Sequence, residues 1–275
     1  FLPEYQLNFF DYPDSGDITE YHQYGAFIFP RYLSDTHGAE IVRRSWLEGE
    51  YWGDPLETIE DLLAEEGETL DDAVFEFGAR NATWDYPLGH NYRGWIEYYG
   101  GYSSSWSHRP SGTITGPQGW TRPPDPPRTL GANYWNVRWR SADASLSFEA
   151  LDSAESWYVA LVTRDGNTHT RTPLNVVNGK VTADLDGLPG ADEAWIVVAV
   201  VDGLDAGTTA TNDYRVLLEE EPPDTGEPPD TGEPPDTGEP PDTGDPQDTD
   251  TDTQGPSDTG EGEDIKGCGC ASGST

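Results

Sequence analysis

The apolar residues in the first third of the chain recur at helical spacing, most clearly over residues 55–66 and 70–82. Side chains three and four positions apart lie on one face of a helix, so each stretch predicts an amphipathic helix with one buried side. The apolar stripes are Leu56, Ile59, Leu62 and Leu63 in the first stretch, and Leu70, Val74, Phe75 and Phe77 in the second. Typical helix-end residues frame them: Asp54 as N-cap, Gly67 as stop, and Thr69 with Asp72 as a capping box.

Two earlier stretches predict further helices. Residues 21–33 have near-helical apolar spacing, and Pro30 is expected to break or kink that helix. Residues 38–49 predict another helix, which Gly49 ends. The residues expected on its buried face are Ile41, Val42, Trp46 and Leu47. The loops between the helices are short, which favours antiparallel packing.

From residue 130 the apolar period changes to that of strands. The predicted strands are residues 134–139, 144–150, 157–162, 172–177, 180–185, 194–201 and 214–218. Asn178-Gly179 predicts a hairpin turn between the strands on either side of it. About seven short strands in fewer than about ninety residues predict a β-sandwich of immunoglobulin or fibronectin type.

Aromatic residues concentrate in residues 84–127, among Gly, Ser and Pro. They predict either an irregular loop packed on the helices or a surface that contacts carbohydrate. In the second case Trp95, Tyr98 and Trp106 are the candidate glycan contacts.

The last part of the chain cannot form a hydrophobic core. From residue 222 the unit Pro-Pro-Asp-Thr-Gly-Glu repeats, and residues 219–264 hold 18 acidic and no basic residues. Proline pairs and like charges favour an extended, disordered stalk. We therefore expect a multidomain α + β chain: a helical domain over residues 1–127, a β-sandwich over 130–218, a disordered acidic repeat stalk over 219–266, and a cysteine motif over 267–275.

Composition excludes some classes of function. The formal net charge of −37 argues against nucleic acid as a partner, because phosphate binding needs a basic surface. The two cysteines, Cys268 and Cys270, lie too close together to cross-link a core. The chain begins at Phe1 and contains no Met, so we expect it to be part of a longer or processed product.

No catalytic motif is found in the sequence. There is no His-Glu-x-x-His and no Gly-x-Ser-x-Gly, and the five histidines show no ligand spacing. The acidic run with Asp248, Asp250 and Asp252 resembles the start of a calcium loop. It lacks the Gly and Glu that such a loop needs, so it predicts weak calcium binding at most.

The tail resembles a known sorting signal. The stalk followed by Gly267-Cys-Gly-Cys-Ala-Ser-Gly273 is similar to the start of the MYXO-CTERM signal of myxobacteria and their relatives. The resemblance implies a secreted protein that a sorting protease cleaves near the cysteines and leaves anchored at the cell surface or outer membrane. Cys268 and Cys270 are then the candidate lipid anchors.

A second resemblance covers the helices. Tyr24-Gly-Ala-Phe-Ile-Phe-Pro-Arg-Tyr-Leu33, Gly38-Ala-Glu-Ile-Val-Arg-Arg-Ser-Trp46 and Leu70-Asp-Asp-Ala-Val-Phe-Glu-Phe77 are similar to the helical region downstream of the zinc site in secreted, gluzincin-like metalloproteases of such bacteria. The resemblance implies a β-domain after the helices and a catalytic half-domain with its zinc upstream. No position in this chain matches a zinc ligand of that family.

These observations predict the non-catalytic C-terminal part of a secreted, surface-anchored zinc metalloprotease. The first alternative is a surface adhesin or glycan-binding protein displayed on a stalk. The second is a purely structural surface protein.

Overall fold

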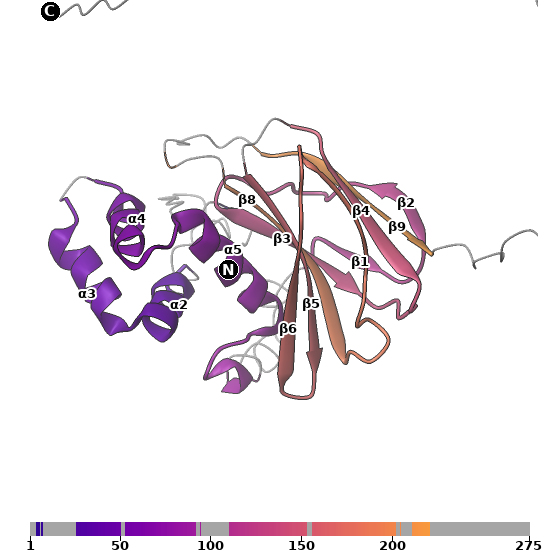
Figure 1. Cartoon of the computed structure of the whole chain (residues 1–275), viewed down its shortest axis with the longest axis horizontal. Helices are drawn as coiled ribbons and strands as arrows, with labels where there is room; N and C mark the ends of the chain where they lie inside the picture. The colour runs from indigo at the N-terminus through magenta and orange to yellow at the C-terminus, as the bar shows by residue number, and fades with distance from the viewer. Residues whose placement is uncertain are drawn as a thin grey trace, which may run out of the picture. The chain divides into compact units, whose positions relative to one another are not determined.

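The computed structural model describes residues 4–5, 7, 26–50, 53–91, 94, 110–152, 156–201, 204 and 211–220. Helices come first along this part of the chain and strands follow (Figure 1). The helices are α2 (Ile28–His37), α3 (Ala39–Glu48), α4 (Pro55–Glu66) and α5 (Leu70–Thr83). The strands are β1 (Gly112–Ile114), β2 (Gln118–Thr121), β3 (Gly131–Val137), β4 (Ala144–Ala150), β5 (Ser156–Asp165), β6 (Thr168–Leu174), β7 (Lys180–Asp184), β8 (Glu193–Val201) and β9 (Tyr214–Glu220). All of them belong to one compact unit, Phe1–Asp224.

The strands form two sheets that pack face to face as a β-sandwich. Sheet A has the strand order β1-β3-β8-β5-β6, and sheet B has the order β2-β9-β4-β7. Alternate residues of both sheets form one buried cluster between them, as Leu146 and Phe148 of β4 show. Their neighbours Ser145 and Ser147 are only partly buried. The predicted alternation in residues 144–150 is therefore confirmed.

Strand β8 is buried on both faces. Ile196 and Val198 lie in the cluster between the sheets, and Val197 and Ala199 lie in a second cluster against α5. A strand covered on both sides needs apolar residues at every position, which explains its continuous apolar run. The prediction of a buried central strand over residues 194–201 is confirmed.

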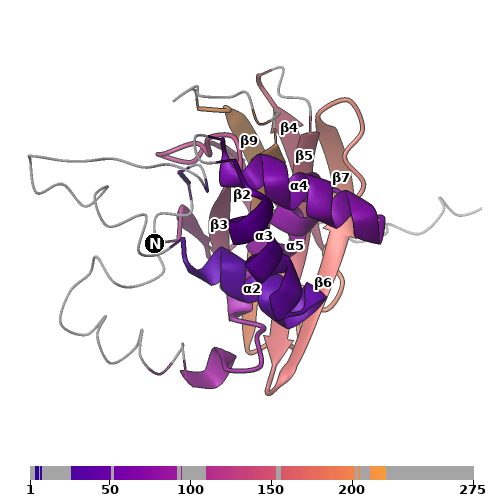
Figure 2. The same ribbon diagram turned by 90° about the vertical axis from the view of Figure 1, so that its left-hand side faces the viewer.

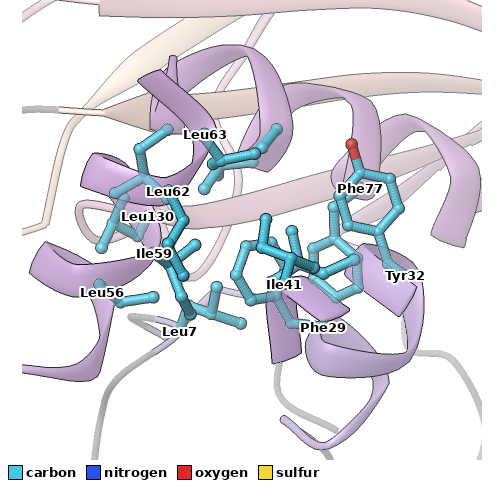
Figure 3. Packing of buried hydrophobic residues seen from close by; sticks show 14 of the residues in the cluster. Leu7, Phe29, Tyr32, Ile41, Leu56, Ile59, Leu62, Leu63, Phe77 and Leu130 are labelled. Carbon is cyan, nitrogen blue, oxygen red and sulfur yellow. The ribbon is translucent and has the colours of Figure 1, made fainter. Parts of the chain in front are cut away.

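Helix α5 joins the helices to the sandwich, and Figures 1 and 2 show it between the other helices and sheet A. One side of α5 contributes Val74 and Phe77 to the buried cluster of the helices (Figure 3). The other side packs Ala79 and Ala82 against β3, β5 and β8. Because these side chains are small, the helix comes close enough for the Tyr134 hydroxyl of β3 to donate to the Gly78 carbonyl, at 3.0 Å. The helices and the sandwich therefore share a continuous packed interface.

Partly buried ion pairs add a second link between α5 and sheet A. Arg171 of β6 lies 3.1 Å from Glu76 of α5, measured between Nη2 and Oε1, and also pairs with Asp85 beyond the helix end. Arg80 Nε donates to the same Glu76 carboxylate at 2.8 Å. These side chains keep some contact with solvent, so each pair contributes about 1 kcal/mol or less. Apolar packing remains the main attachment.

The predicted helix ends of α4 and α5 are confirmed. Asp54 Oδ1 accepts a hydrogen bond from the Leu56 backbone N–H at 2.9 Å. Thr69 Oγ1 accepts from the Asp72 backbone N–H at 3.1 Å and donates to the Asp72 carboxylate at 2.7 Å. Gly67 ends α4 with a left-handed backbone, φ 82°, which glycine adopts without steric cost.

The predictions for α2 and α3 were partly wrong. Pro30 was expected to break a helix over residues 21–33, but α2 begins at Ile28 and Pro30 lies in its first turn, where its missing N–H removes no helical hydrogen bond. Helix α3 ends at Gly49 as predicted. Of its expected apolar face Ile41 is buried, but Trp46 and Leu47 are 83% and 67% exposed. The reason is that α3 packs mainly on α2 and α4 and lies at the outer edge of the helices.

The turn at Asn178-Gly179 is present, but the hairpin predicted around it was wrong. Both residues have positive φ, 51° and 70°, and Val177 and Lys180 exchange backbone hydrogen bonds across the turn. Beyond that single bridge the chain crosses from one sheet to the other, because β6 pairs with β5 in sheet A and β7 pairs with β4 in sheet B. Turn chemistry is local, whereas the choice of strand partner depends on the whole sandwich.

At the level of fold class, a helical part followed by a two-sheet sandwich is confirmed. The narrower immunoglobulin or fibronectin type stays a prediction. β1 runs parallel to β3. Both β1 and β2 belong to the sheets but precede residue 130, where the range predicted for the sandwich begins. Of the stalk predicted over residues 219–266, Glu219 and Glu220 lie in β9. The rest of it and the cysteine motif, residues 221–275, lie outside the described residues.

Candidate functional site

The outer face of sheet B carries the most distinctive set of side chains in the described part of the chain. It lies on the side of the sandwich opposite α5, because α5 packs on sheet A. The pairing registers place its residues in three rows: Arg215, Glu149 and Lys180; Leu217, Ser147 and Thr182; and Glu219, Ser145 and Asp184. These residues alternate with the buried ones of the same strands, so the rows follow from strand geometry.

Trp120 of β2 extends the first row, which we call the Trp120 row: Trp120, Arg215, Glu149 and Lys180. The Arg215 guanidinium carbon lies 4.3 Å from the centroid of the Trp120 ring, a cation–π contact. Arg215 Nε donates to Glu149 Oε2 at 2.6 Å, and Lys180 Nζ lies 2.7 Å from Glu149 Oε1. The row therefore crosses all four strands as one continuous set of contacts.

Glu149 holds the Trp120 row together. Its hydrogen bonds from Lys180 and then from Arg215 lower the pKa of the carboxyl, so Glu149 stays ionised at neutral pH. The carboxylate in turn fixes the guanidinium of Arg215, which lies against the indole. An exposed aromatic ring supported in this way presents a fixed flat surface.

The other two rows offer hydroxyl groups and carboxylates. Ser147 and Thr182 hydroxyls lie 2.9 Å apart across β4 and β7. Asp184 and Glu219 flank Ser145 in the third row, and both are exposed. The face as a whole is polar and slightly acidic, with one large exposed apolar side chain, Trp120, which is 43% exposed.

The sequence predicted three strands of this face, β4, β7 and β9, but neither β2 nor the face itself. Trp120 lies inside the aromatic stretch 84–127 but was not among the candidate glycan contacts. The signal that could have found the face is the set of polar residues that alternate with the apolar ones in residues 144–150 and 214–218, because alternate residues of a strand face outward. The pairing of β2 with β9 could not be predicted from the sequence, because these strands are about ninety residues apart.

The candidate residues named from the sequence lie elsewhere in the chain. Trp95, Tyr98 and Trp106, the cysteines Cys268 and Cys270, and the calcium candidates Asp248, Asp250 and Asp252 all lie outside the described residues. The structure therefore brings none of them together with the Trp120 row.

Two of the described histidines, His37 and His169, have structural surroundings. His37 Nδ1 lies 2.8 Å from Glu66 Oε2, which links α2 to the end of α4. His169 Nδ1 lies 2.9 Å from the hydroxyl of Thr83, which is fully buried and so closed to a substrate. Among the described residues no three His, Cys, Asp or Glu side chains are grouped so that they could bind a metal ion. Nor does any helix in this part of the chain combine the length and hydropathy needed to span a membrane.

Comparison with solved structures finds a match to the pre-peptidase C-terminal domain of a collagenase from Bacillus anthracis. The two chains are 10% identical, and the match covers 41% of this chain and 99% of that chain with a TM-score of 0.28. A likeness at this TM-score supports no conclusion about the function of this chain. No curated protein matches it.

A protein-family model matches residues 7–156, and its description is "Family of unknown function (DUF6055)". The matched stretch includes α2–α5 and β1–β4 and reaches the first residue of β5, more than half of the 275 residues. The chain belongs to the DUF6055 family, a family of unknown function.

Proposed function

We propose that the chain is a non-catalytic accessory part of a longer, secreted protein of the zinc metalloprotease type, and that its sandwich holds the substrate or the surface on which that protein works. The resemblance of the segments 24–33, 38–46 and 70–77 to helices downstream of a gluzincin zinc site supports the first half of the proposal. In such a protein the zinc ligands and the catalytic carboxylate come from the upstream half-domain.

One observation carries the second half: α5 packs on the helices with one side and on sheet A with the other. A catalytic half-domain that contacts the helices would therefore have a fixed orientation relative to the sandwich. The outer face of sheet B, on the opposite side, stays available to hold a ligand. Sites built on rigid elements hold their ligands more precisely than sites on loops.

The gene upstream of the codon for Phe1 tests the peptidase half of this proposal. We expect a His-Glu-x-x-His motif within about 100–200 preceding codons, followed by a helix with a third carboxylate ligand. The full-length product should then hydrolyse casein, and Gln in place of the motif's Glu should abolish this activity while zinc stays bound. An upstream region without such a motif would contradict the proposal.

We further propose that the tail anchors the protein at the cell surface through Cys268 or Cys270. Replacing both cysteines by Ser should move the protein from the membrane fraction to the medium, measured by fractionation and immunoblotting. Thr259→Ser is the matched control, because it changes the same tail without touching a thiol. Unchanged fractionation of the double cysteine variant would exclude a thiol-linked anchor.

A glycan-binding adhesin is the second candidate function. The exposed indole of Trp120, supported by Arg215, favours this function, because a flat exposed ring can contact a sugar. An adhesin of this kind needs no catalytic half-domain. The two candidates share the outer face of sheet B and differ in what lies upstream.

A further inference from the structure

We infer that the outer face of sheet B binds a neutral glycan chain, which stacks one sugar ring on Trp120 and lies along the Trp120 row. This inference deepens the proposed function, because it names the class of ligand that the sandwich holds. Glycan binding itself does not depend on an upstream peptidase. Only the biological role of the binding rests on that part of the proposed function.

The charge of the face limits the class of ligand that it can bind. Within the Trp120 row both cations already pair with Glu149, which has hydrogen bonds to Arg215 and Lys180. Asp184 and Glu219 add exposed negative charge in the third row. An anionic ligand would meet these carboxylates, and the acidic chain as a whole would repel it. The face therefore favours a ligand without charge.

The Trp120 indole is held in place by its neighbours. Arg215 lies against the Trp120 ring and is fixed by Glu149, while 43% of the Trp120 surface remains exposed. The ring is thus already ordered before a ligand arrives, so binding costs little side-chain entropy. Trp combines a flat apolar ring with an N–H donor. The C–H face of a pyranose ring matches that surface, and its hydroxyls remain at the edges to form hydrogen bonds.

Groups that can form further hydrogen bonds lie next to the Trp120 ring. A guanidinium has five N–H donors, and Glu149 occupies only Nε and Nη2 of Arg215. The hydroxyls of Ser147 and Thr182 bond to each other, but each also has lone pairs for a further partner. Donors and acceptors therefore lie side by side, as the hydroxyl groups of a sugar require.

The size of the face and its few apolar side chains distinguish between a glycan and a folded protein as its ligand. Four adjacent strands span three interstrand spacings, or ~14 Å, which suits a short run of sugar units lying across the strands. A stable protein partner needs about 800 Å² on each side and several apolar anchors at its centre. Among the described residues of this face, Trp120 is the only large hydrophobic side chain that is exposed. The face fits a glycan better than a folded protein.

The test uses the full chain on an array of neutral glycans, including cellulose, chitin, xylan and β-glucan oligosaccharides, with gelatin as a protein probe. We expect saturable binding to at least one neutral glycan, and a loss of about tenfold or more in affinity for Trp120→Ala. Trp46→Ala is the matched control, since Trp46 is even more exposed but lies on α3. It should bind like the unchanged protein.

A second variant separates binding from folding. Thr182→Ala removes one hydroxyl, and its exposed bond to Ser147, from the edge strand β7. It should weaken glycan binding while changing the stability by only about 0.5 kcal/mol. No binding to any neutral glycan, binding only to gelatin, or equal binding by the Trp120→Ala protein would each overturn the inference. These outcomes say nothing against an upstream zinc motif, and the absence of that motif would leave glycan binding unaffected.

Discussion

Replacing Phe148 by alanine is expected to lower the free energy of unfolding by about 3–5 kcal/mol, a large share of the stability of a typical domain. Phe148 is 1% exposed and lies between the two sheets. Its ring centroid is 5.4 Å from that of Trp157 and 5.6 Å from that of Tyr214. Removing the ring leaves a cavity among aromatic side chains that can only partly close.

The cavity would also loosen a buried hydrogen-bond chain. Tyr214 accepts a hydrogen bond from Trp135 Nε1 at 2.8 Å and donates to Asn133 Oδ1 at 3.0 Å. A displaced Tyr214 ring leaves buried polar groups without partners, which adds to the loss of packing.

Chemical denaturation followed by tryptophan fluorescence measures the effect of Phe148→Ala. Ser147→Ala is the matched control, because Ser147 precedes Phe148 on the same strand and faces outward. It should change stability by about 0.5 kcal/mol or less. If Phe148→Ala does not fold, the milder Phe148→Leu should still lose more stability than Ser147→Ala. A loss below about 1 kcal/mol for Phe148→Ala would mean that the two sheets are not packed as described.

The features that could be predicted from the sequence are those decided by neighbouring residues. Asp54 binds the N–H of Leu56, two residues away, and Thr69 binds Asp72, three residues away. The alternation that turns Phe148 inward likewise depends only on strand geometry. Such signals are complete within a few residues, so they survive whatever the rest of the chain does.

The features that could not be predicted depend on distant partners. Trp46 fits an apolar helix face, but no described element covers that side of α3. The small residues Ala79 and Ala82 were not part of the apolar stripe predicted for α5, yet they form its contact with sheet A. A small side chain adds little to a periodic apolar pattern in the sequence. Its role in close packing is seen only when a second surface lies against it.

The candidate site shows the same limit. Each strand of the Trp120 row was predicted or lay in an aromatic stretch, but the row exists only because β2, β9, β4 and β7 are neighbours in that order. Residues 120, 149, 180 and 215 are brought together by pairing across the sheet. No local pattern in the sequence records that order.

Alkaline pH is expected to unfold the protein in one steep transition above about pH 10. Four tyrosines are buried: Tyr32, Tyr86, Tyr134 and Tyr214. Mainly because of this burial, the pKa of each hydroxyl lies well above its ordinary value. In the unfolded chain these hydroxyls ionise near pH 10, whereas in the folded protein they keep their protons. Stability from their burial is therefore complete below about pH 10 and is lost as the pH rises above it.

The expected slope is large because the groups act together. Each such tyrosine lowers the free energy of unfolding by about 1.4 kcal/mol per pH unit, so four lower it by about 5.5 kcal/mol per pH unit. A domain of ordinary stability, about 5–15 kcal/mol, then unfolds within about one to three pH units. Lysine adds little to this titration, because the chain has only Lys180 and Lys266, and arginine keeps its charge in this range.

Circular dichroism and tyrosinate absorbance, recorded on the same alkaline titration, measure this transition. Loss of secondary structure should coincide with a step in tyrosinate absorbance. Tyr32→Phe keeps the ring of a residue that is 1% exposed and removes its hydroxyl, so it should lower the slope by about 1.4 kcal/mol per pH unit. The chain has 14 tyrosines, and those exposed to solvent ionise near pH 10 in the folded protein as well. Ionisation of all 14 by about pH 12 with native circular dichroism retained would contradict the burial of these four hydroxyls, because a folded protein that ionises them cannot be holding them away from water.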